Sequence, residues 1–106
     1  MLRLFRSIFR GHVGDEANAV KMDGHLEAIN ALVSKADGHV KTKRTVCKAE
    51  WAYEFEIVFK DLESFKGYMG SELKEKQLTP LLEKAVNDCV SDKEGIYLGA
   101  RVYDEL

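Results

Sequence analysis

Three side chains of this sequence, His25, Tyr53 and Tyr68, have the chemistry to act on a small molecule. A histidine titrates near neutral pH and can serve as a general base. A tyrosine hydroxyl can form a hydrogen bond with the oxygen of a carbonyl or a phenol. We therefore predict His25, Tyr53 and Tyr68 as candidate catalytic residues. The alternative is that both tyrosines are core aromatics and that His25 is a solvated residue at a helix edge.

Residues 51–59, which read WAYEFEIVF, are the segment most able to position such groups. Aromatic and aliphatic side chains recur at every second position, which is typical of a β-strand with two different faces. One face is almost wholly aromatic, whereas the other carries Glu54 and Glu56. Two neighbouring carboxylates can do acid–base chemistry. The alternative is that they form ion pairs at a dimer interface.

The remaining elements follow from periodicity and from helix signals. Apolar residues at alternating spacings of three and four predict a helix over 19–36, and Gly38 follows it as a stop signal. Asp61 can cap a short helix that begins at Leu62, and a longer helix is predicted over 73–90. Within that longer helix, either Thr79 caps a new helix or Pro80 kinks a continuous one. Residues 39–49 and 96–103 are predicted strands.

The first eleven residues, MLRLFRSIFRG, allow two interpretations. They are basic and carry apolar residues at helical spacing, as a targeting presequence does. They also alternate like a strand, with Phe5, Ser7 and Phe9 on one face and Arg6 and Ile8 on the other. We predict the strand.

The resulting element order, β-α-β-β-α-β, predicts one α+β domain over residues 1–106 with a ferredoxin-like fold. Two helices then cover one face of a four-stranded antiparallel sheet. The natural pocket lies between the sheet and the helices. We expect Phe5, Trp51, Tyr53 and Tyr68 to bind a substrate there, with His25 nearby and a contribution from Tyr97 or Tyr103.

The second face of the sheet would carry apolar residues together with Glu54, Glu56, Arg6 and Arg101. Such an apolar face favours burial against a second copy of the chain, which would also allow the charges to pair. We therefore predict a homodimer with these four residues at its interface. The alternative is a solvated face, which antiparallel sheets tolerate.

Composition limits the classes of partner. The formal net charge of −2 gives no electrostatic attraction to nucleic acid, and the apolar runs are too short to cross a membrane. The two cysteines, Cys47 and Cys89, are expected as free thiols of a cytoplasmic protein, with one disulfide as the alternative. His12, His25 and His39 lie 13 and 14 positions apart, which matches no common zinc pattern. We predict neither a metal nor another cofactor.

The strand WAYEFEIVF, the following KDLESFKGYM and the later LTPLLEKAV resemble the dimeric α/β-barrel superfamily. The resemblance is strongest to the stress-responsive A/B barrel (Dabb) family, and second to the antibiotic-biosynthesis monooxygenase type. It implies two ferredoxin-like sheets closing into one barrel. It also implies that Tyr68 orients a substrate, as a tyrosine of the same helix does in a plant polyketide cyclase of the Dabb family. Where that cyclase has His-Pro-x-His, residues 71–74 read Ser-Glu-Leu-Lys.

These observations predict a homodimer that binds a hydrophobic, oxygenated small molecule. Such a protein could also be an enzyme that acts on this molecule without a cofactor, as a cyclase or a monooxygenase. A non-catalytic, stress-associated dimer without a ligand is the alternative. A haem-degrading monooxygenase is a third possibility, and it requires a histidine facing the pocket.

Overall fold

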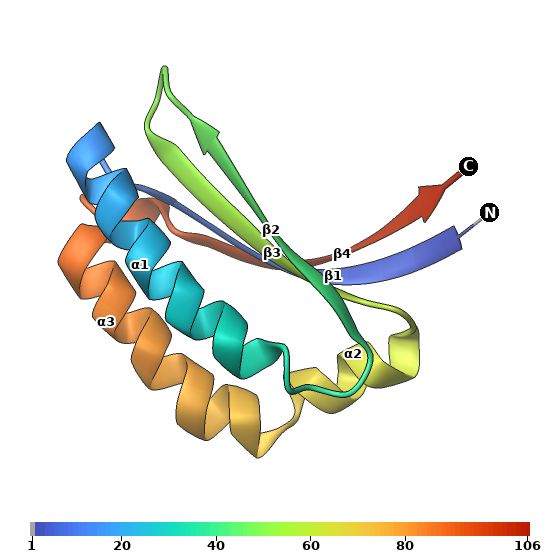
Figure 1. Cartoon of the computed structure of the whole chain (residues 1–106). Helices are drawn as coiled ribbons and strands as arrows, with labels where there is room; N and C mark the ends of the chain where they lie inside the picture. Colours follow the sequence, from blue (N-terminus) through green and yellow to red (C-terminus); the bar gives the residue numbers. More distant parts are fainter. Residues whose placement is uncertain (1) are drawn as a thin grey trace.

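The computed structural model describes residues 2–106 and places four antiparallel strands in one sheet with the order β2-β3-β1-β4. The strands are β1 (Leu2–His12), β2 (His39–Cys47), β3 (Ala52–Phe59) and β4 (Tyr97–Glu105). Helices α1 (Glu16–Val33) and α3 (Thr79–Cys89) lie side by side across one face of the sheet (Figure 1). The short helix α2 (Leu62–Met69) lies at one end of that helical layer (Figure 1). This confirms the predicted ferredoxin-like α+β fold.

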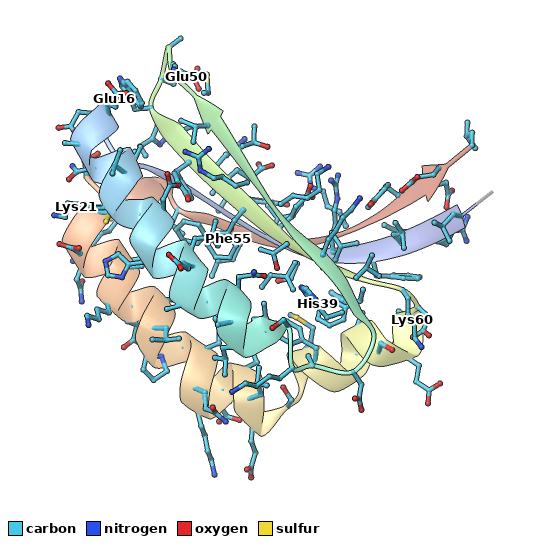
Figure 2. The ribbon with its side chains drawn as sticks, in the orientation of Figure 1. Glu16, Lys21, His39, Glu50, Phe55 and Lys60 are labelled. Atoms are coloured by element: carbon cyan, nitrogen blue, oxygen red, sulfur yellow. The ribbon has the colours of Figure 1, made fainter. Side chains whose placement is uncertain are left out.

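The central strand β3 forms because its period-two pattern suits a sheet that is covered on one side. Tyr53, Phe55, Ile57 and Phe59 belong to the buried core with the helices, and Phe55 points from the sheet toward them (Figure 2). Trp51 differs from the prediction because it belongs to the turn before β3 and has a positive φ of 51°. The hairpin lacks a glycine at this position, so Trp51 itself takes the left-handed conformation that reverses the chain.

Side-chain caps fix where two of the helices begin. Asp15 accepts a hydrogen bond from the Asn18 amide at 2.8 Å at the start of α1. Asp61 accepts one from the Ser64 amide at 2.7 Å at the start of α2, and this bond lowers the pKa of the Asp61 carboxyl. The predicted cap at Asp61 is therefore confirmed, and it fixes the position of α2 along the chain.

The region around Pro80 is continuous rather than broken. The π-helical segment η1 (Leu73–Leu78) leads directly into α3, and both Leu78 and Thr79 have helical backbone angles. The backbone N–H of Thr79 bonds the carbonyl of Lys74, five residues earlier, and the Thr79 hydroxyl donates to the same carbonyl at 3.1 Å. A widened turn accommodates the proline ring, which would clash inside a regular helix. The second alternative for Pro80, a continuous helix, is the one observed, with a π-turn in place of a simple kink.

The N-terminal segment forms strand β1 from Leu2 onward, as predicted. It pairs with β3 on one side and with β4 on the other, so it lies in the middle of the sheet. Met1 lies outside the described residues. Across residues 2–106, no helix is both long enough and apolar enough to span a membrane.

Candidate functional site

A cavity of about 240 Å³ lies between the helix-facing side of the sheet and the segment that runs from α2 into α3. Its walls are mainly apolar and come from β1, β3, β4 and the helices; they include Phe9, Phe55, Ile57, Tyr68, Met69, Leu78, Leu82 and Leu98. A second, more open hollow of about 480 Å³ shares Phe9, Lys74, Thr79, Leu82 and Leu98 with it. The shared residues join the two into one groove along α3 and β4, which we call the β4 groove.

Tyr68 is the predicted site residue that lines this cavity. Helix α2 turns Phe65 and Tyr68 toward the core, and the Tyr68 ring lies against Phe59 with 4.8 Å between the ring centroids. The side chain is 3% exposed, yet its hydroxyl has no hydrogen-bond partner among residues 2–106. Burial raises the pKa of the Tyr68 phenol, so the group stays protonated and can act as a hydrogen-bond donor. A buried hydroxyl without a partner is unusual, because folding then removes it from water without compensation.

Three further polar residues line the same cavity, namely Ser7 of β1, Lys74 of η1 and Thr79 of α3. Lys74 is the cationic residue of this lining, and it also lines the open hollow. Among the described residues that line the 240 Å³ cavity, none is a histidine, an aspartate or a glutamate. The cavity can therefore donate hydrogen bonds and stabilise negative charge, but its lining provides neither a carboxylate base nor a histidine that could bind haem iron.

Tyr53, predicted for the same pocket, lies on the other side of the core. Its hydroxyl donates a hydrogen bond to Asp23 at 2.6 Å, and the guanidinium of Arg44 lies 5.5 Å from the centre of its ring. Arg44 also pairs with both carboxylate oxygens of Asp23. Burial raises the pKa of the Tyr53 phenol, and the bond to Asp23 adds to this effect. Tyr53 thus has a structural partner and does not line the cavity.

The remaining predicted pocket residues are dispersed. His25 projects from α1 toward α3 and contacts Asp88, Phe5 packs on Phe65, and Trp51 lies in the β2–β3 turn. None of these three belongs to the described lining of the 240 Å³ cavity. Tyr97 and Tyr103 pair with β1 residues of the uncovered face, so they point away from the cavity.

The uncovered face of the sheet carries the residues predicted for a dimer interface. Glu56, 5% exposed, accepts a hydrogen bond from Arg6 and lies 3.4 Å from the Lys43 ammonium. Glu54 lies opposite Arg10, and Arg101 lies opposite Arg6. One chain therefore already pairs the most buried carboxylate of this face.

Most apolar residues of this face are covered within one chain, which differs from the expected exposed apolar area, although Leu2 at its end is exposed. Ile8 and Val58 are buried, although no helix lies over them. Long side chains explain this. Tyr97 lies across Gly99, which pairs with Ile8, and a Cβ at Gly99 would clash with the Tyr97 hydroxyl. Arg6 stacks over Tyr103 with its guanidinium carbon 4.8 Å from the ring centre.

Sequence reasoning missed the residues that β4 and η1 contribute to the cavity, above all Lys74 and Leu98. Ser7 and Phe9 were not predicted for the pocket either, although the alternation in β1 placed them on the same face as the predicted Phe5. Lys74 carried no such signal, because its position depends on the π-turn before Pro80.

Comparison with known proteins supports the fold and goes no further. No family model matches the chain, and no curated protein sequence matches it. Among solved structures, a dimeric ferredoxin-like protein of unknown function from Jannaschia sp. CCS1 superposes with a TM-score of 0.64 at 12% identity, over 92% of this chain and 97% of that chain. SnoaB, a cofactor-independent oxygenase from Streptomyces nogalater, gives a TM-score of 0.64 at 10% identity, over 100% of this chain and 95% of that one.

A candidate antibiotic biosynthesis monooxygenase from Bordetella bronchiseptica is similar to the same degree, with a TM-score of 0.65 at 10% identity over 97% of each chain. At such identities the likeness establishes a shared ferredoxin-like fold. The predicted order of the two families, with the Dabb family first, stays a prediction.

Proposed function

We propose that this protein binds a small, hydrophobic and oxygenated molecule in the 240 Å³ cavity, with the Tyr68 hydroxyl bonded to the oxygen of that molecule. The single observation that carries this proposal is the buried Tyr68 hydroxyl without a partner among residues 2–106. A buried polar group left unpaired costs about 1–3 kcal/mol, and a ligand oxygen would remove that cost. The molecule would complete a hydrogen bond that the chain leaves open.

The size and chemistry of the cavity define the ligand class. Ligand pockets usually measure about 300–1,000 Å³, so a cavity of 240 Å³ suits one or two rings, and the β4 groove gives room for a substituent. Aromatic and aliphatic walls favour an aromatic skeleton. The Lys74 ammonium favours an oxygen that is anionic or becomes so, such as that of a phenol.

Binding of paired aromatic probes tests this assignment. We expect 1-naphthol to bind up to about tenfold more tightly than 1-methylnaphthalene, because the two have similar shapes and differ in the hydroxyl. Tyr68→Phe should remove that preference and leave the affinity for 1-methylnaphthalene unchanged. Tyr53→Phe is the matched control and should keep the preference, since Tyr53 lies outside the cavity lining. Equal preference in wild type and Tyr68→Phe would contradict the proposal and favour a protein without this ligand.

The proposed reaction class is oxygenation by O₂ without a cofactor, which the fold shared with SnoaB supports. Tyr68 and Lys74 would stabilise negative charge on the substrate oxygen while the ring passes electrons to O₂. For 1-naphthol, one O₂ would give one naphthoquinone and one water. An oxygen electrode measures this consumption. If O₂ consumption with the protein equals that in buffer alone, the protein does not oxygenate 1-naphthol, and only the binding function is retained.

The proposed assembly is a homodimer formed through the uncovered face of the sheet. The Jannaschia protein of the same fold is named as dimeric. Among residues 2–106 the Arg6 Nε and the Tyr103 hydroxyl lack partners although both are buried, and Leu2 on this face is exposed. Native mass spectrometry should give twice the 12.0 kDa of one chain, and Arg101→Glu should shift the population toward monomer. A monomer in the wild-type protein would exclude this assembly.

A further inference from the structure

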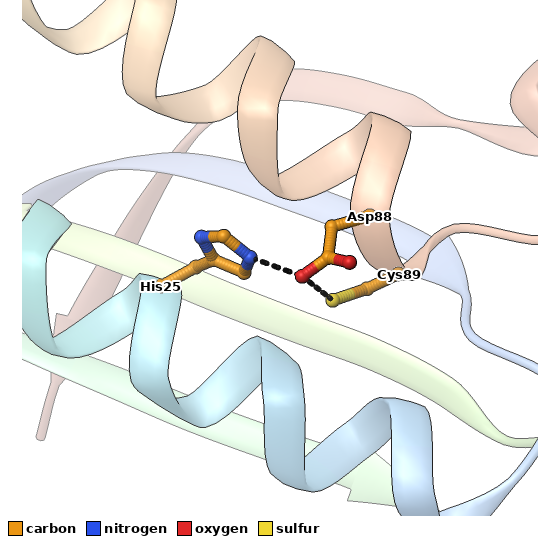
Figure 3. A group of neighbouring side chains, drawn as sticks. All are labelled: His25, Asp88 and Cys89. Carbon is orange, nitrogen blue, oxygen red and sulfur yellow. Dashed lines mark hydrogen bonds and ion pairs between the residues drawn. The ribbon is translucent and has the colours of Figure 1, made fainter.

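A cluster of three potential metal ligands lies at the seam between α1 and α3, away from the cavity. His25 comes from α1, whereas Asp88 and Cys89 come from the last turn of α3 (Figure 3). The His25 Nε2 lies 2.8 Å from Asp88 Oδ2, and the Cys89 Sγ lies 3.8 Å from the same oxygen. The three ligand atoms all fall within 4.8 Å of one another.

Each of the three residues contributes one potential ligand atom to this cluster. Figure 3 shows the His25 imidazole and the Cys89 sulfur both next to the same carboxylate oxygen of Asp88. Cys89 is 3% exposed, yet its sulfur faces this polar group. Cys89 thus belongs to the buried core and also places its sulfur beside a charged group.

The surroundings also hold the carboxylate in place. Lys21, one turn before His25, lies 2.8 Å from the other oxygen of Asp88, Oδ1, and its ammonium also donates to the Asp88 carbonyl at 3.3 Å. Asp88 Oδ2 therefore remains directed toward His25 and Cys89. A partner that orients a ligand through its second atom is a regular feature of protein metal sites.

We propose that His25 Nε2, Asp88 Oδ2 and Cys89 Sγ form a binding site for a divalent transition metal ion of the Zn²⁺ class. One nitrogen, one oxygen and one sulfur donor suit this class of ion, and a water molecule would fill the fourth position. Tetrahedral Zn²⁺ would place these donors about 3.4–3.6 Å apart. His25 and Asp88 would separate by several tenths of an ångström, and Cys89 would approach, through side-chain rotation.

The proton balance of binding is simple. The thiol of Cys89 loses its proton to solvent when the metal–sulfur bond forms. The proton that His25 Nε2 donates to Asp88 also leaves to solvent, and the neutral imidazole that binds the ion carries its single hydrogen on Nδ1. The hydrogen bond between His25 and Asp88 is thereby replaced by two metal–ligand bonds. Carboxylate and thiolate together balance the charge of the ion. Burial raises the pKa of the free Cys89 thiol, so the ion has to displace a firmly held proton.

Titration of the full-length, untagged chain with Co²⁺ tests the site. We expect one Co²⁺ per chain to produce a thiolate-to-cobalt charge-transfer absorption in the near ultraviolet, which an excess of Zn²⁺ removes by displacement. Cys89→Ser should abolish this absorption, and His25→Gln should weaken Co²⁺ binding by at least about tenfold. His25 is more exposed than Cys89, so this second variant keeps the test valid if the Cys89→Ser variant fails to fold.

The chain offers a matched control for each ligand. Cys47 is exposed on β2, and Cys47→Ser should leave the absorption and the affinity unchanged. His12→Gln should do the same, because His12 lies at the end of β1. Absence of a saturable absorption in the wild type, its loss in Cys47→Ser, or full affinity in His25→Gln would each overturn the proposal.

Discussion

The two fully or nearly fully buried tyrosines, Tyr53 and Tyr68, show how differently the two ends of the helical layer are built. Tyr53 donates to Asp23, which Arg44 also binds, so its polar end has a partner. Tyr68 lies in a cavity, and its hydroxyl has no partner within residues 2–106. Burial raises the pKa of both phenols. The same residue type, equally buried, is thus part of a closed core at one end and of a hollow at the other.

This difference separates stability from function within one small domain. A core that pairs its polar groups gains stability from them, whereas a binding site commonly keeps a polar group unpaired for its ligand. The closed region comprises α1, the facing side of α3, and Tyr53. The hollow region comprises α2, η1 and the β4 groove. Four measurements test whether the two regions differ in this way.

The largest effect should come from overpacking the closed region. Ala85 is 0% exposed on α3, within the core shared with α1. Ala85→Leu should lower the free energy of unfolding by about 1–3 kcal/mol, because a well-packed site has no room for three more carbons. Ala100→Leu, at the exposed edge of the cavity, is the matched control and should change stability by less than about 0.5 kcal/mol. Urea unfolding measures both, and equal losses would mean that the two regions are packed alike.

The next effect concerns the polar end of Tyr53. Tyr53→Phe should lower the free energy of unfolding by about 1–2 kcal/mol, since it removes a hydrogen bond to a charged acceptor. Combining it with Asp23→Asn in a double-mutant cycle isolates that bond from the Arg44 pair. An unchanged urea midpoint for Tyr53→Phe would show that this hydroxyl contributes as little as that of Tyr68.

Tyr68→Phe should act in the opposite direction. Removing a buried hydroxyl that has no partner should raise the free energy of unfolding of the ligand-free protein by about 1 kcal/mol. The same substitution should weaken binding of 1-naphthol. Thermal unfolding with and without the probe measures both effects. A destabilised Tyr68→Phe variant would show that the hydroxyl has a partner in the folded chain.

The smallest effect is a loss of stability in acid that arises at the contact between α1 and α3. The Lys21 ammonium first, and the His25 imidazole second, lower the pKa of Asp88 from its usual 3.8 to about 2. Because the folded-state pKa is the lower one, Asp88 stabilises the protein above about pH 4 and loses that contribution as the pH falls toward 2. Asp88→Asn should flatten the decline of the urea midpoint over this interval, whereas Asp104→Asn tests the separate pair with Arg3. An identical slope in wild type and Asp88→Asn would contradict the assignment.

Much of the fold could be predicted from the sequence because it depends on local patterns. The period of two in residues 51–59 predicted β3, and the cap at Asp61 predicted the start of α2. Trp51 was placed one residue into the strand because alternation does not reveal a positive φ. The sequence left two alternatives at Pro80, because a residue without a backbone N–H fits both the first position of a new helix and a kink in a continuous one. The structure shows a π-helical segment directly before Thr79 and Pro80.

The sites depended on contacts that no local pattern encodes. His25 and Asp88 are 63 positions apart, so spacing rules for metal ligands could not join them. Likewise, Tyr53 and Tyr68 look equivalent in the sequence, as aromatic residues of apolar faces. They differ because the Tyr53 hydroxyl bonds to Asp23, which lies 30 positions before Tyr53 in the sequence.

Hydrophobic periodicity and capping act over a few residues, so they were sufficient to predict the element order and the side of each element that faces the core. Packing between distant segments determines which tyrosine lacks a partner, where the cavity lies and that three ligand atoms meet at one seam. The physical reason is that hydrogen bonds and cavities depend on ångström-scale distances between segments distant in sequence, which are fixed when the whole core packs.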